Sequence, residues 1–151
     1  MEMNAAMVAV LGGISGAVVA AVWQYVTNLL NANISTINDH IQEIKTIEAL
    51  AIRYWLIDPK SDPTAEHESE ALLLGAMNAS AMFNAQGEKL LGYRHGEYLD
   101  LDQQLFEAAT GGDFGVKAKQ PDYQRVTEIS TICCKIRAFL RECRKAQFGA
   151  R

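Results

Sequence analysis

The apolar run AAMVAVLGGISGAVVAAVW covers residues 5–23, and the rest of the chain has to accommodate it. No formally charged side chain lies between Glu2 and Asp39. An α-helix over 5–30 would span roughly 30 to 38 Å, which is enough to cross a hydrocarbon core of about 30 Å. The run therefore predicts a transmembrane helix inside an anchor that covers 1–32.

The end of the apolar run has the composition of a helix that leaves a bilayer. Trp23 and Tyr25 lie there, and amphipathic rings of this kind settle among lipid headgroups. Their neighbours Gln24 and Asn28 are polar but uncharged. We therefore assign Trp23 and Tyr25 to the membrane interface. The alternative is a soluble helical oligomer that buries 5–30 in its core, because an apolar run suits both environments.

Small residues recur every four positions along the same run. Such faces let helix backbones approach closely, and association in lipid depends on that packing because lipid tails are as apolar as the helix. The pattern predicts a self-associating helix, although alanine and glycine are also simply common in membrane spans. The two ridges are Gly12, Gly16 and Ala20, and Ala9, Gly13 and Ala17.

The remainder, 33–151, has helical periodicity throughout and no strand pattern. We expect an all-α protein in which the transmembrane helix continues into an up-and-down bundle of about four helices. Two regular apolar seams support this expectation, and the last helix should pack along the first. The seams are Ile34, Ile37, Ile41 and Ile44, followed by Val126, Ile129, Cys133, Ile136, Leu140 and Cys143.

Two further helices are expected between these seams. The first of them has a start signal, because Asp62 can cap it with Pro63 at the first helical position, or Thr64 can cap it instead. The body of this helix, 71–83, is apolar on more than one face, so we expect it to be the central helix of the bundle, closed by Gly87. A third soluble helix is expected over about 98–109.

The net charge of −4 is unevenly distributed, because the middle of the chain is acidic and 121–151 is basic. A solvated helix face is one explanation of the positive charge of 121–151, and contact with anionic lipid is the alternative. Nucleic acid is not expected as a partner, because the basic residues of this stretch lack the interleaving with aromatic residues that is typical of a nucleic-acid surface.

No residue pattern points to catalysis, a cofactor or a metal. The cysteines lie in the last helix, and we interpret them as small buried hydrophobic residues of a protein in a reducing compartment. The histidines fall on separate segments and are interpreted as solvated side chains. No nucleophile stands in a recognisable setting, so no enzymatic activity is expected. These residues are Cys133, Cys134 and Cys143, and His40, His67 and His95.

The plan of the chain resembles a loose group of small bacterial membrane-anchored proteins. The resemblance rests on the apolar N-terminal run, on Glu48-Ala49 and Tyr54-Trp55 in the following helix, and on the segment LFEAATGGDF at 105–114 before a basic final helix. Some proteins of that build are similar to membrane effectors of phage-defence systems, including retron-type ones. The resemblance implies a bacterial origin and a membrane-acting effector, and it supplies no active-site residues.

Three functions remain open from the sequence. The first is a single-pass inner-membrane protein, with its N-terminus outside and its bundle in the cytoplasm, that associates with copies of itself and perturbs the membrane. The second is a passive tether that holds a cytoplasmic protein partner at the lipid bilayer. The third is the soluble helical oligomer that buries 5–30.

Overall fold

The computed structural model describes the backbone of residues 3–58, 60–116 and 119–149, and the side chains of 17–58, 60–116 and 119–147. Within these residues the fold is all-α, which confirms the predicted fold class, and no strand is present. The elements are α1 (Met3–Leu56), α2 (Pro63–Ala81), α3 (Asn84–Leu91), the 3-10 helix η1 (Gly92–Arg94), α4 (His95–Thr110) and α5 (Tyr123–Gly149).

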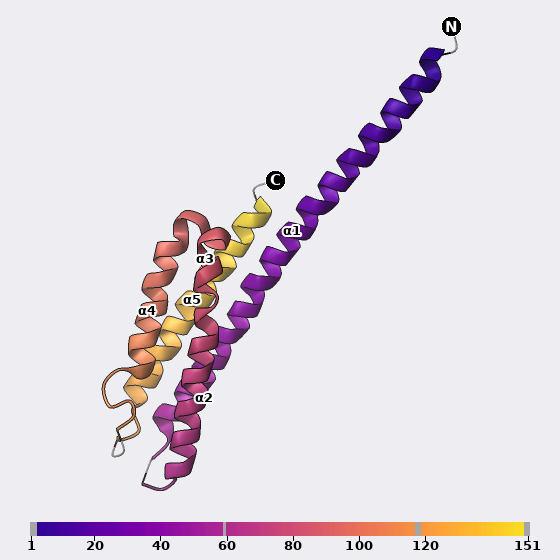
Figure 1. The fold of residues 1–151 in the computed structure, drawn as a ribbon. Helices are drawn as coiled ribbons and strands as arrows, with labels where there is room; N and C mark the ends of the chain where they lie inside the picture. The colour runs from indigo at the N-terminus through magenta and orange to yellow at the C-terminus, as the bar shows by residue number, and fades with distance from the viewer. Residues whose placement is uncertain (1–2, 59, 117–118, 150–151) are drawn as a thin grey trace. The chain divides into compact units, whose positions relative to one another are not determined.

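The chain divides into two compact units, Met1–Ser35 and Thr36–Arg151. The first unit is one stretch of helix, and the second is a helical bundle. In the bundle, the second half of α1, then α2, α4 and α5 run in alternating directions (Figure 1). Among the residues with described side chains, no helix has an apolar stretch long enough to cross a membrane. Residues 5–16 of the predicted span lie outside that set.

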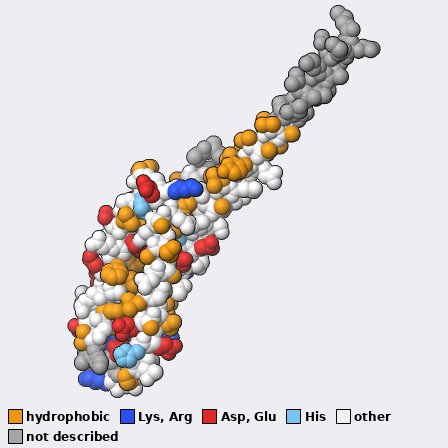
Figure 2. Space-filling model, viewed as in Figure 1, with side chains coloured by type: hydrophobic (Ala, Val, Ile, Leu, Met, Phe, Trp, Pro, Cys, Tyr) orange, Lys and Arg blue, Asp and Glu red, His pale blue; other side chains and the backbone are white. Residues whose placement is uncertain are grey.

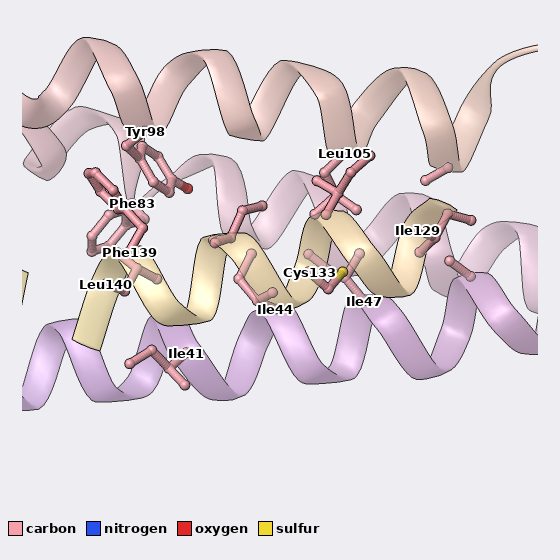
Figure 3. Close-up of a cluster of buried hydrophobic side chains, with 14 of the residues drawn as sticks. Ile41, Ile44, Ile47, Phe83, Tyr98, Leu105, Ile129, Cys133, Phe139 and Leu140 are labelled. Atoms are coloured by element: carbon pink, nitrogen blue, oxygen red, sulfur yellow. The ribbon is translucent and has the colours of Figure 1, made fainter. Parts of the chain in front are cut away.

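The core of the bundle is organised around α5. Figure 3 shows α5 between α1 and α4, with the side chains of Ile44, Cys133 and Leu105 turned toward one another. α5 contacts α1, as predicted, but it packs more extensively against α4, which the sequence analysis did not expect. Burying each large apolar side chain of this core contributes about 1.5–3 kcal/mol.

The expectation that α2 is the central helix is wrong. Leu73 is its only fully buried large apolar residue, whereas Leu72, Leu74 and the following Met82 are exposed. Its apolar residues are spread around the helix, so their pattern does not define one inward face. Contacts with the neighbouring helices therefore decide which side of α2 is buried.

The start of α2 follows the sequence prediction, but the end does not. Asp62 Oδ1 accepts a hydrogen bond from the Ala65 amide over 2.9 Å, which confirms the cap. The helix ends at Ala81, and Gly87 lies inside α3 instead of closing α2. A Cβ at Gly87 would come within 2.7 Å of His95 Nε2, so the glycine is needed for this close approach. The third soluble helix, α4, begins slightly earlier than expected and ends at Thr110.

Candidate functional site

The predicted association face is only partly described. The side chains of Ala9, Gly12, Gly13 and Gly16 lie outside the described residues, whereas those of Ala17 and Ala20 are exposed. The predicted interface residues Trp23 and Tyr25 are 62% and 70% exposed. Figure 2 shows hydrophobic side chains on the surface of this part of α1. Its exposed large apolar residues are Val18, Val19, Val22, Trp23, Tyr25, Val26 and Leu29.

Most residues of the two predicted seams lie in the core of the bundle. Ile34 and Val126 are half-buried, and the other seam residues are buried. The sequence analysis missed Ile47, which is also buried and continues the spacing from Ile44 to Ala51. Glu48 interrupts the apolar pattern because it forms an ion pair with Arg137 of α5 at the edge of the core. The spacing of Ile44, Ile47 and Ala51 in the sequence could have predicted that Ile47 is buried.

His40 is at the centre of a buried polar network, so the interpretation of the histidines as solvated is wrong for this residue. Its Nδ1 lies 2.8 Å from Glu43 Oε2, and its Nε2 lies 2.7 Å from the Tyr98 hydroxyl. Its ring stacks on Phe83, with centroids 3.8 Å apart. An ionised Glu43 only accepts hydrogen bonds, so the neutral imidazole carries its proton on Nδ1 and accepts from Tyr98 at Nε2.

This network has the carboxylate, imidazole and hydroxyl order of a catalytic triad, but its burial works against that chemistry. Burial lowers the pKa of His40, although the Glu43 carboxylate opposes the shift. Burial also raises the pKa of the Tyr98 hydroxyl, which is fully buried. A neutral hydroxyl held in this way is a poor nucleophile, so the network ties α1, α4 and Phe83 together instead. A cavity of about 220 Å³ lies beside it, lined partly by His40 and Met82.

A second polar centre lies where α1 ends. The buried Lys119 donates from Nζ to the carbonyls of Tyr54 over 3.0 Å and Ile57 over 2.8 Å. It also lies 4.6 Å from the centroid of the Tyr54 ring and 3.7 Å from Glu66 Oε1, which is an ion-pair distance. The lysine thus satisfies carbonyls that the end of α1 leaves open. Its partners come from distant segments, so nothing near Lys119 in the sequence predicted this role.

Arg125 forms a third centre with the glycines that follow α4. Its guanidinium lies 4.5 Å from the Trp55 ring centroid, and Nη1 donates to the Ala108 carbonyl over 3.0 Å. Gly112 has a positive φ of 63°, and a Cβ there would come within 2.6 Å of Arg125 Nη2. The double glycine therefore ends α4 and also makes room for the arginine. An open cavity of about 470 Å³ adjoins Trp55, Arg125 and Asp122.

The cysteines differ from one another. Cys133 and Cys143 are buried, and burial raises the pKa of the Cys133 thiol to about 12. Cys134 is exposed, so its assignment to the buried stripe is wrong, and Arg137 Nη2 lies 3.1 Å from its sulfur. Adjacent helix positions point in different directions, which explains the difference. The described residues contain no group of three or more His, Cys, Asp or Glu side chains arranged to hold a metal ion.

Comparisons with family models, curated proteins and solved structures find no match for this chain. The resemblance to phage-defence effectors therefore stays a prediction, and function has to be argued from the residues themselves.

Proposed function

We propose that the protein is a membrane-anchored helical protein that associates with copies of itself through its first 30 or so residues and acts as an effector at the membrane. The observation that carries the proposal is the exposure of consecutive apolar side chains in the first unit. Val18, Val19 and Val22 are each more than half exposed, whereas the core isoleucines of the bundle are at most 6% exposed.

A single helix cannot bury these side chains by itself. Removing each of them from water would contribute about 1.5–3 kcal/mol, so together they favour either a bilayer or another apolar surface. The absence of formal charge between Glu2 and Asp39 favours the bilayer, because a charged residue at its centre is costly. The small-residue ridges then offer a face on which copies can pack closely.

The first experiment is alkaline carbonate extraction of membranes from cells that express the full chain. Retention in the pellet supports an integral span over 5–30. Release into the supernatant would contradict the membrane anchor and favour the soluble oligomer, in which 5–30 is buried against other copies.

Self-association is tested by Gly16→Ile in the full chain, measured by crosslinking in membranes. The larger side chain should separate the ridges and reduce the crosslinked oligomer several-fold. Val18→Ile is the matched control, because Val18 lies two positions from Gly16 and therefore on the opposite side of the helix from the ridges. If Gly16→Ile leaves association unchanged, the ridges are not the interface.

The effector role is tested by growth of bacterial cells that express the full chain. A membrane-perturbing effector should slow growth, and Gly16→Ile should relieve the effect, because perturbation depends on association. A passive tether would behave differently, since an unrelated span could replace 5–30 without loss of function.

A further inference from the structure

One end of the bundle gathers segments from three helices. Arg144 Nη1 donates to Asn38 Oδ1 over 2.6 Å, and Gln147 Nε2 donates to the Leu90 carbonyl over 2.9 Å. These hydrogen bonds hold the end of α5 beside the end of α3 and beside the part of α1 that belongs to the bundle. We call this region the basic end. Its cations are Lys89, Arg141, Arg144 and Lys145.

Within the part of the chain that the structure describes, no carboxylate forms an ion pair with a cation of the basic end. Arg94 pairs with Glu97 at 3.0 Å and with Glu142 at 3.4 Å, so both carboxylates are already engaged. None of the ion pairs among the described residues includes a cation of the basic end, and Arg144 is held by an amide oxygen instead. Glu88 is an exposed carboxylate there that lies outside these pairs. Positive charge therefore remains available to an external anion.

The covalent chain limits how far the basic end can lie from the end of the predicted span. Asn38 follows residue 30, the end of the predicted span, by eight positions, which is about 12 Å of helix. The headgroup layer extends about 5–8 Å beyond the hydrocarbon, and charges interact over a Debye length of about 8 Å in physiological salt. A connection of this length allows lipid phosphates to come within electrostatic reach of the basic end.

At the opposite end of the bundle, the described residues of the turn between α1 and α2 include more solvent-facing carboxylates than cations. There α1 ends and α2 begins, and several carboxylates surround this turn. Among them, Glu68 is paired with Arg53 only at 4.0 Å between exposed side chains. An anionic surface attracts one end of such a bundle and repels the other. The carboxylates are Asp58, Asp62, Glu68 and Glu70, beside the exposed cations Arg53 and Lys60, whereas Glu66 is buried and paired with Lys119.

Building on the proposed membrane anchor, we infer that the basic end is a binding surface for the anionic phospholipid headgroups of the leaflet from which the bundle emerges. Arginine and lysine side chains make charge-assisted hydrogen bonds to phosphate oxygens. Because these cations lie on α3 and α5, the contact holds the bundle against the membrane through segments far from the anchor in sequence.

The test uses the full chain, reconstituted into vesicles of phosphatidylcholine alone or with phosphatidylglycerol as the anionic lipid. A fluorophore is attached to Ala146→Cys in a Cys134→Ser background, and its quenching by acrylamide is measured. The remaining thiols, Cys133 and Cys143, are buried and have raised pKa values, so they react slowly. Quenching should fall by about twofold with anionic lipid at low salt and recover at high salt.

Two charge-reversal variants make the test specific. Replacing the exposed cations of the basic end should abolish the lipid dependence, whereas replacing exposed cations elsewhere should preserve it. The basic-end variant is Lys89→Glu, Arg141→Glu and Lys145→Glu, and the control is Arg53→Glu, Lys60→Glu and Lys135→Glu.

The outcomes separate this inference from the proposed function. A chain that resists carbonate extraction but is quenched equally in both vesicles keeps its anchor and overturns the headgroup contact. Equal loss of lipid dependence in both variants would also overturn it, because attraction would then follow net charge alone. Release by carbonate would overturn the anchor and the headgroup contact together.

Discussion

Two helices of the same bundle, α5 and α2, relate to the core in opposite ways. α5 buries a regular apolar stripe and leaves its charged residues at the edge or in solvent. α2 buries Glu66, Ser69 and Ser80, while Leu72 and Leu74 are exposed. The difference shows that a high apolar content does not make a helix central: what places a helix is whether its apolar residues share one face.

The place of α2 depends on polar contacts at its two ends. At its start, Glu66 faces the buried Lys119, and just beyond its end, Phe83 stacks on His40. Asn84 Nδ2 then donates to Asp102 Oδ2 of α4 over 3.0 Å. We therefore expect α2 to respond most to loss of polar partners, and α5 to loss of apolar volume.

The largest effect should come from Lys119→Met in the full chain. It leaves Glu66 as a buried carboxylate without its cation, and removing one partner of a buried pair typically costs about 3–5 kcal/mol. Denaturant unfolding in detergent, followed by circular dichroism, measures the change. The double variant with Glu66→Leu should recover the part of the loss that comes from the unpaired carboxylate, but not the part that comes from the Tyr54 and Ile57 carbonyls, which stay without the lysine donor. A change below about 1 kcal/mol in the single variant would mean that the pair does not hold α2.

A slightly smaller loss is expected from Leu140→Ala in α5. Its side chain is fully buried, and truncating such a leucine typically costs about 2–5 kcal/mol through lost burial and the cavity left behind. The matched control on α2 is Leu72→Ala, which should cost no more than about 0.5 kcal/mol because that side chain is 45% exposed. Equal losses in the two variants would remove the contrast between the helices.

Acidification should loosen the His40 contact at the end of α2. The pKa of His40 is lowered from 6.5 in the folded protein, so the unfolded chain binds the proton more readily. The His40 contribution to stability is therefore present above pH 6.5 and decreases as the pH falls below it. His40→Gln should flatten this part of the stability profile, measured by thermal unfolding between pH 7.5 and pH 5. An unchanged slope of stability against pH in the His40→Gln variant would show that His40 is not the source of this pH dependence.

The smallest effect is expected from Ser80→Ala, on the inward face of α2. The buried Ser80 hydroxyl has no hydrogen-bond partner among the described residues, so its removal should stabilise the bundle by up to about 1 kcal/mol. The exposed Ser61→Ala is unsuitable as a control because its hydroxyl donates to Asp58, so Asn78→Ala on the exposed face of α2 serves instead. Destabilisation by Ser80→Ala would indicate that the hydroxyl has a partner after all, such as a water molecule.

The sequence predicted those features that depend on neighbours along the chain. The all-α class, the Asp62 cap and the regular seams on α1 and α5 follow from helical periodicity and capping chemistry, which act within a few residues. The Asp62 cap needs only the amide of Ala65, three positions away.

The polar centres were not predicted, because each one includes a contact between residues more than fifty positions apart. His40 looks like a surface histidine until Tyr98 and Phe83 enclose it, and Lys119 looks like a loop lysine until the end of α1 covers it. Exposed Cys134 and buried Cys133 are adjacent and identical in type, and the seam periodicity that includes only Cys133 was the signal that separates them.

The sequence by itself determined the long helices of this protein, though not α3, and the long uncharged stretch before the bundle, because the spacing and charge of residues are local properties. Only the tertiary structure decided which helix is central and which polar groups are buried. It also decided which cations share the basic end. Burial and ion pairing depend on contacts between distant segments, and a one-dimensional pattern does not record those contacts.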